Sequence, residues 1–121
     1  MPTLTEKRGP GEFIAHEANG TISREDVTID TGDLLAGTVL GRITATGKMV
    51  QVDLAAVDGS EVAAGILYAD ADATLADVAA VAIVRHAEVK ADLVVYPTGA
   101  SQNDIDAIDA DLKALQIKVV A

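Results

Sequence analysis

The chain has 121 residues, half of them hydrophobic, and its 19 acidic residues outnumber nine Lys and Arg to give a formal charge of −10. Such a charge repels phosphate backbones and anionic lipids, which argues against nucleic-acid and membrane partners. Cysteine is absent, which excludes disulfides, zinc–thiolate sites and thiol catalysis. We expect one small domain with a core of Ala, Val, Ile and Leu, because the only aromatic residues are one Phe and two Tyr.

The first twelve residues, MPTLTEKRGPGE, are polar and contain two prolines and two glycines. They lack the apolar stretch of a secretory signal, so we expect a protein that is not exported. Because Leu4 is their only sizeable apolar side chain, we expect residues 1–12 to form a flexible arm. A single β-rich domain is then expected over residues 13–121. Its most apolar run, residues 75–84, is too short to span a bilayer.

From residue 13 the sequence alternates short β-branched segments with turn residues, a pattern that indicates strands. The pair Asn19 and Gly20 predicts a hairpin turn, and residues 30–33 and 58–59 predict two further turns. A loop or a single helical turn is expected near residues 74–79. Strands are expected at VTI (27–29), TVLGRIT (38–44), MVQVDLA (49–55), VAIVRHAEV (81–89) and DLVVY (92–96).

The last segment predicts a helix followed by a short strand. Ser101 stands at the N-cap position, and Asp104 three residues later completes an acidic variant of the capping box. The strand is expected at IKVV (117–120), and the fold class is therefore mostly β with one C-terminal helix (α+β). Apolar residues recur every three or four positions along one face of the helix: Ile105, Ile108, Leu112 and Leu115.

The stretch LGRITATGKM (40–49) has the outline of a phosphate-binding loop but not its spacing. Five residues rather than four separate Gly41 from Gly47, and Met49 follows Lys48 where a Walker A loop needs a hydroxyl. We therefore interpret this stretch as two strands joined by a tight turn around residues 45–47.

His86 and Glu88 would lie on the same side of a predicted strand, where they could ligate metal or do acid–base work. The other histidine, His16, is distant in sequence, and no third ligand stands at a recognisable spacing. A surface or interface pair is the simpler interpretation. Since G-x-S-x-G and EF-hand patterns are also absent, we predict a protein that is not an enzyme, with no catalytic residue, metal site or cofactor.

Residues 30–49, DTGDLLAGTVLGRITATGKM, also resemble the hammerhead region of biotinyl and lipoyl carrier domains. In those domains a lysine at the tip of a hairpin is acylated, and Lys48 would be that lysine. The sequence departs from the carrier pattern, because Gly47 precedes Lys48 where carriers have Met or Asp. An acyl carrier domain is therefore kept as the alternative function.

Five stretches together resemble the lambda-type phage head decoration protein family: EFIAHEANGTISREDVTI, LLAGTVLGRIT, DGSEVAAGILY, VRHAEVKADLV and the acidic helix that ends in LQIKVV. The resemblance implies a small, non-enzymatic protein with a compact β-clip-like fold. It further implies a homotrimer at each local three-fold site of the expanded head, where the protein cements the major capsid protein against DNA pressure. The protein would be made in the host cytoplasm and lie on the outer surface of the virion.

The resemblance also implies that the arm pairs with strands of the capsid. Six arm residues are expected to make this contact, the first three by strand formation and the last three by setting register through charge: Thr3, Leu4, Thr5, Glu6, Lys7 and Arg8.

The trimer contact is harder to place from the sequence. One candidate is the glycine-flanked stretch AAGILY, with Ile66, Leu67 and Tyr68 as contact residues. The alternative interpretation of the same stretch is an ordinary core strand.

Overall fold

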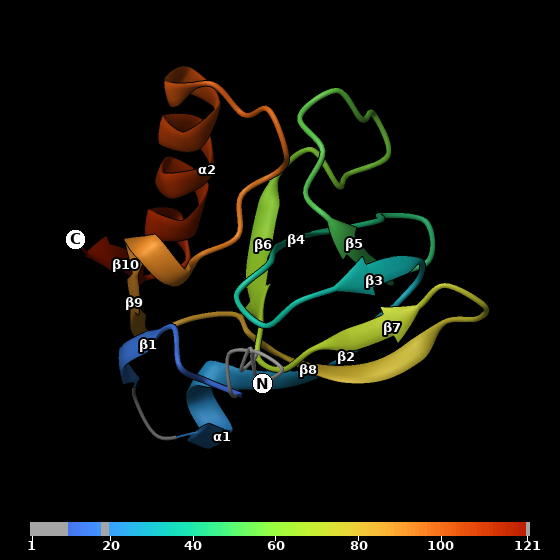
Figure 1. Ribbon diagram of the computed structural model, residues 1–121, viewed down its shortest axis with the longest axis horizontal. Helices are drawn as coiled ribbons and strands as arrows, with labels where there is room; N and C mark the ends of the chain where they lie inside the picture. The colour runs from blue at the N-terminus through green and yellow to red at the C-terminus, as the bar shows by residue number, and fades with distance from the viewer. Residues whose placement is uncertain (1–9, 18–19, 121) are drawn as a thin grey trace, which may run out of the picture.

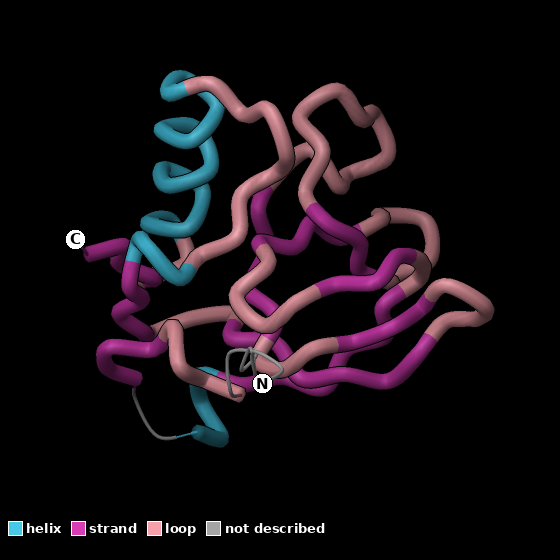
Figure 2. Tube along the Cα trace, viewed as in Figure 1, coloured by secondary structure: helices cyan, strands magenta, loops and turns pink. Residues whose placement is uncertain are grey.

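A computed structural model describes residues 10–17 and 20–120 of the chain, shown in Figures 1 and 2. Strands dominate these residues, and one long helix, α2, stands beside them at the C-terminal end (Figure 1). This arrangement confirms the expected fold class. No helix in the described part of the chain is long and apolar enough to cross a membrane.

The elements follow one another along the chain with short connections. In order they are β1 (Ile14–Glu17), α1 (Gly20–Ser23), β2 (Arg24–Ile29), β3 (Gly32–Leu34), β4 (Val39–Arg42), β5 (Met49–Gln51), β6 (Ala63–Leu67), β7 (Ala71–Ala73), β8 (Val78–Ile83), β9 (Ala87–Lys90), the 3₁₀ turn η1 (Ala91–Leu93), α2 (Gln102–Ala114) and β10 (Ile117–Val120).

A small closed barrel is formed by the strands in the order β2, β5, β4, β6, β8, and β3 and β7 pair as a two-stranded sheet. β2 and β8 run antiparallel, and the barrel closes where Ile29 of β2 pairs with Met49 of β5. Because side chains alternate along a strand, one face of these strands supplies an aliphatic core. Its members are Val27, Ile29, Leu34, Leu40, Met49, Leu67, Ala71, Ala73, Ala82 and Val84.

A second core joins the barrel to the C-terminal lobe, which comprises β1, β9, β10 and α2. In this lobe β9 is the central strand, antiparallel to β1 and parallel to β10. α2 packs against β10 and β6 (Figure 1). The core consists of Phe13, Val39, Val52, Ala63, Ile66, Ile83, Ala87, Val89, Val94, Ile108, Leu112 and Ile117.

The predicted helix and its cap are confirmed. The Ser101 hydroxyl accepts a hydrogen bond from the backbone N–H of Asp104, and the Asp104 carboxylate accepts one from the N–H of Ser101. On the predicted apolar face Ile108 and Leu112 are buried. The closing strand is confirmed as β10.

The predicted turn at residues 45–47 is also confirmed. The N–H of Gly47 donates to the carbonyl of Ile43 over 2.8 Å, and β4 and β5 pair antiparallel on either side of the turn. The loop expected near residues 74–79 spans residues 74–77, after which β8 begins at Val78.

Three local predictions are wrong. The single strand expected at residues 81–89 is interrupted between β8 and β9. Asn19 lies outside the described residues, and Gly20 begins the helical turn α1 rather than a hairpin. The strands on either side do not pair, because β1 joins β9 and β2 joins β8. The stretch DLVVY is not a strand either: it contains η1, and only Val95 forms an isolated bridge, with Thr38.

Candidate functional site

The six predicted capsid-contact residues, 3–8, lie outside the described residues, so the arm can be followed only from Pro10. Residues 10–13 form a turn that leads into β1. Phe13 is buried in the second core, and its carbonyl accepts a hydrogen bond of 2.7 Å from the N–H of Lys90 in β9. The chain is therefore fixed to the C-terminal lobe at Phe13.

Gly11, at the centre of this turn, is packed against Tyr68. Its N–H donates to the Tyr68 carbonyl over 3.0 Å, and its φ of 73° lies in the left-handed region that favours glycine. A Cβ atom at this position would lie 2.8 Å from Cε2 of the Tyr68 ring. Both the backbone conformation and the available space therefore favour glycine here.

Tyr68 follows β6 and is held by the barrel. Its N–H donates to the carbonyl of Val81 over 2.9 Å. The guanidinium of Arg24 lies 4.2 Å from the centre of its ring, a cation–π contact. The ring is partly buried and packs against the second core. Tyr68 thus connects the barrel to the turn from which the arm leaves.

The other two residues considered for a trimer contact have no exposed surface. Ile66 and Leu67 are both 0% exposed and belong to the two cores of a single chain. Of the three candidates, only Tyr68 retains surface that a second subunit could cover.

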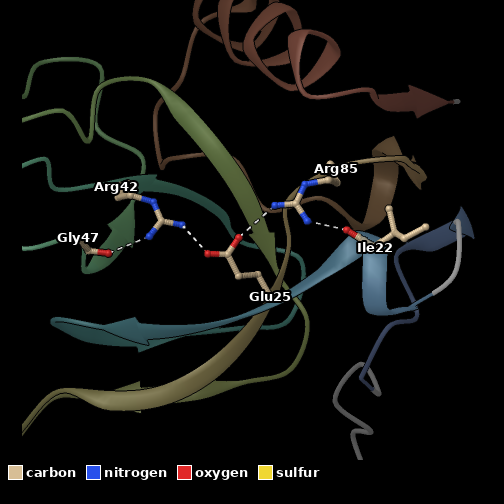
Figure 3. A network of polar contacts seen from close by, with 5 residues as sticks. All are labelled: Ile22, Glu25, Arg42, Gly47 and Arg85. Carbon is tan, nitrogen blue, oxygen red and sulfur yellow. Dashed lines mark hydrogen bonds and ion pairs between the residues drawn. The ribbon is translucent and has the colours of Figure 1, made fainter.

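Beside Arg24, a polar network crosses the surface of the barrel, as Figure 3 shows. The Glu25 carboxylate lies between two guanidinium groups, 3.5 Å from Arg42 and 3.2 Å from Arg85. Arg42 also donates to the carbonyl of Gly47, and Arg85 to the carbonyl of Ile22 in α1. The three charged side chains are about 40% exposed, so each pair contributes little stability by itself. Together they connect β2, the β4–β5 turn and α1.

Lys48 is held by neighbouring carboxylates rather than presented at the hairpin tip. Its Nζ lies 3.0 Å from Asp77 and 3.9 Å from Asp30. The hydrogen bond to Asp77, with the charge of that residue, raises the pKa of Lys48. A raised pKa leaves less of the neutral amine for acylation, so this geometry does not favour the carrier alternative.

The prediction that His86 and Glu88 share one side of a strand is wrong. His86 precedes β9 and has a φ of 54°, so it lies in the turn after β8. In the sheet, the residue opposite Glu88 on β1 is His16, which is distant in sequence. Within residues 10–17 and 20–120, no three His, Asp or Glu residues are grouped as a metal site.

The site features that the sequence did not indicate come from segments far apart in the chain. The composition of residues 1–12 places Gly11 in the arm, yet Gly11 packs against Tyr68, which follows β6. Arg42, Arg85 and Glu25 meet only because β2 pairs with β8 and lies beside β5 in the barrel. In the sequence, the dipeptide Pro10–Gly11 indicates a turn at the base of the arm.

A comparison with known protein families matches residues 3–117 to the family described as bacteriophage lambda head decoration protein D. A comparison with curated proteins finds no match. The family match includes the arm residues 3–8, Tyr68 and the helix α2, and it confirms the resemblance seen in the sequence. The family is a structural one of the phage head and not a known enzyme family. Nearly the whole chain is matched, and the protein therefore belongs to the bacteriophage lambda head decoration protein D family.

Proposed function

We propose that this protein binds as a homotrimer at local three-fold sites of the expanded phage head and cements subunits of the major capsid protein against the pressure of packaged DNA. The family match over residues 3–117 carries the proposal. The protein is made in the host cytoplasm and added to the outer surface of the head. Its role is structural, and it needs no catalytic residue or cofactor.

The described residues supply a suitable body for this role. The second core joins the barrel to the C-terminal lobe, so load on one side of the molecule is passed to the other through packed side chains. A trimer would present three such bodies and three arms at once. Binding through several linked contacts raises occupancy far above that of a single contact.

The arm makes the contact with the capsid by strand pairing. Residues 1–9 precede the turn at Gly11 in the sequence, and nine fully extended residues span at most about 30 Å. Pairing of an extended segment with an exposed strand edge uses backbone hydrogen bonds for affinity and side chains for specificity. Thr3, Leu4 and Thr5 form the strand, and the charges of Glu6, Lys7 and Arg8 set its register.

The trimer contact includes Tyr68, because Ile66 and Leu67 are enclosed within one chain. The partly buried ring at the end of β6 leaves apolar surface beside the Arg24 guanidinium. Aromatic and arginine side chains are enriched at protein interfaces.

Co-sedimentation of the purified protein with expanded and unexpanded shells of the same phage tests the proposal. We expect binding to expanded shells that saturates at three copies for each three-fold site. A variant that lacks residues 1–9 should stay folded and lose binding. Unchanged binding by that variant would exclude the arm mechanism, and absence of binding by the full chain to both shells would exclude the cementing role.

A further inference from the structure

We propose that Tyr68 is a positioning residue for the arm: by holding Gly11 it fixes the place at which residues 1–9 leave the domain, and so strengthens attachment to the head. This inference rests on the proposed function, because it assigns Tyr68 a part in the same attachment. It goes beyond that function in naming a residue of the folded body that acts through the arm.

The hold on Gly11 has two independent parts. The backbone of Tyr68 accepts the N–H of Gly11, and the ring of Tyr68 occupies the space where a side chain at residue 11 would stand. The turn closes on itself as well, since the N–H of Ile14 donates to the carbonyl of Gly11 over 3.0 Å. A side chain at Gly11 would have to displace the ring and adopt an unfavourable φ.

Tyr68 is itself fixed to the barrel. Its N–H is bonded to Val81 of β8, and Arg24 of β2 lies over its ring. On the other side of the turn, Phe13 is buried and bonded to Lys90 of β9. Residues 11–13 are thus held between the barrel and the C-terminal lobe, and Gly11 is the residue at which this turn meets the barrel.

The consequence for binding follows from chain entropy. With Gly11 held, the arm starts from one defined point on the domain when it binds the capsid. Without the Tyr68 contact, Gly11 keeps the hydrogen bond that Ile14 donates within the turn, but the turn is then fixed to the body of the domain through Phe13, and residues 11 and 12 are released from the barrel. Each released backbone must be ordered again on binding, so we expect the affinity for shells to fall about tenfold or more.

The chain offers a matched set of variants. Tyr68→Ala removes the ring, Tyr68→Phe retains it, and Gly11→Ala introduces the clash without altering Tyr68. Tyr96 is the other tyrosine of the chain and is also partly buried, but it is bonded to Asp109 of α2. Tyr96→Ala therefore controls for general loss of stability.

Two readouts separate positioning from stability. The first is the rate at which trypsin cleaves the peptide bond between Arg8 and Gly9 in the free protein, followed by intact mass. A protease needs extended chain on both sides of the bond, so release of Gly11 should speed cleavage about tenfold. The second is co-sedimentation with expanded shells, with urea unfolding and sedimentation velocity run on every variant.

We expect Tyr68→Ala and Gly11→Ala to bind shells about tenfold more weakly and to be cleaved faster. Tyr68→Phe and Tyr96→Ala should bind shells and be cleaved at Arg8 as the parent protein is, although Tyr96→Ala is less stable. If Tyr68→Ala and Gly11→Ala bind as the parent protein does, while removal of residues 1–9 abolishes binding, the positioning role is overturned. The proposed function then still stands. Equal loss by Tyr96→Ala also overturns the positioning role. Parental binding by Gly11→Ala beside weaker binding by Tyr68→Ala overturns it too, because the effect of Tyr68 would then belong to the trimer contact. Should the parent protein bind no shell, the proposed function fails, and the cleavage rates still decide whether Tyr68 holds the chain.

Discussion

The hydroxyl of Tyr96 donates a hydrogen bond of 2.6 Å to the carboxylate of Asp109, and this contact ties the segment after η1 to α2. Tyr96 is partly buried. Burial, together with the hydrogen bond and charge of Asp109, raises the pKa of Tyr96 above its ordinary value. The fold therefore favours the neutral phenol, which can donate, over the phenolate, which cannot.

Replacement of Tyr96 by Phe should lower the free energy of unfolding by about 1–2 kcal/mol, because a bond to a charged acceptor is lost. The pKa of Tyr96 is higher in the folded state than in the unfolded state. The stabilisation by this hydrogen bond is therefore complete below the ordinary tyrosine pKa of about 10 and is lost as the pH rises through the folded-state pKa. Urea unfolding at several pH values measures both effects. The double-mutant cycle of Tyr96→Phe and Asp109→Asn isolates the interaction energy between the two side chains. An identical loss of stability above pH 10 in the parent protein and in Tyr96→Phe would contradict this role of the Tyr96 hydroxyl.

The capping box gives a second prediction. Ser101→Ala should destabilise the protein by about 1 kcal/mol, because the N–H of Asp104 loses its acceptor at the exposed start of α2. Asn103→Ala, an exposed substitution in the same helical turn, is the matched control and should change little. Thermal unfolding followed by circular dichroism compares the two. Equal stability of the two variants would show that the Ser101 cap does not stabilise α2.

Gly41 supplies a third prediction, based on close approach of two backbones. A Cβ atom on Gly41 would overlap the backbone of Ser60, whose carbonyl also accepts a hydrogen bond from Asp53. Gly41→Ala must therefore push β4 away from the loop before β6, and we expect a loss of about 3 kcal/mol or more.

Gly47→Ala is the comparison for Gly41→Ala. Gly47 has a φ of 74° but open space around it, so alanine there meets conformational strain without a clash. We expect a loss of about 1–2 kcal/mol. Denaturant unfolding ranks the two variants, and a smaller loss for Gly41→Ala than for Gly47→Ala would contradict the packing argument.

The fourth prediction concerns acid stability. Asp58 accepts hydrogen bonds from the hydroxyl and the N–H of Ser60, and these bonds lower the pKa of Asp58. Its stabilising contribution is present above the ordinary pKa of 3.8 and is lost as the pH falls through the lower folded-state value. Ser60→Ala should therefore raise the pKa of Asp58, as measured by carboxyl NMR titration.

An internal reference exists for this titration. Asp72 accepts the same two kinds of hydrogen bond from Thr74 in another loop, and its pKa is lowered for the same reason. Ser60→Ala should leave the pKa of Asp72 unchanged. A shift of both carboxyl groups would indicate a change in the whole protein rather than the loss of one hydrogen-bond donor.

Local signals were sufficient for parts of this fold. The N-cap Ser101, the apolar repeat of α2 and the turn before Gly47 each depend on residues within a few positions, and the structure confirms all three. The family resemblance was confirmed too, and it rested on the order of several stretches along most of the chain.

The predictions that were wrong depend on pairing between distant segments. Asn19 and Gly20 have strong hairpin chemistry, yet β1 pairs with β9 and β2 pairs with β8. His86 follows β8 in a turn bonded to Leu115 and Gln116, which no periodicity within residues 81–89 indicates. The contact between Gly11 and Tyr68 likewise joins residues far apart in the chain. Tertiary pairing decided each case.

The central position of β9 has a consequence for how the protein is made. Val89 lies opposite Ile14 of β1 on one side and Val119 of β10 on the other, so the two neighbours of one strand come from opposite ends of the described chain. The sheet cannot be completed until residues 117–120 have emerged from the ribosome. The sheet is therefore completed only after the barrel strands have been synthesised. Truncation of β10 would leave β9 with an exposed edge that invites aggregation.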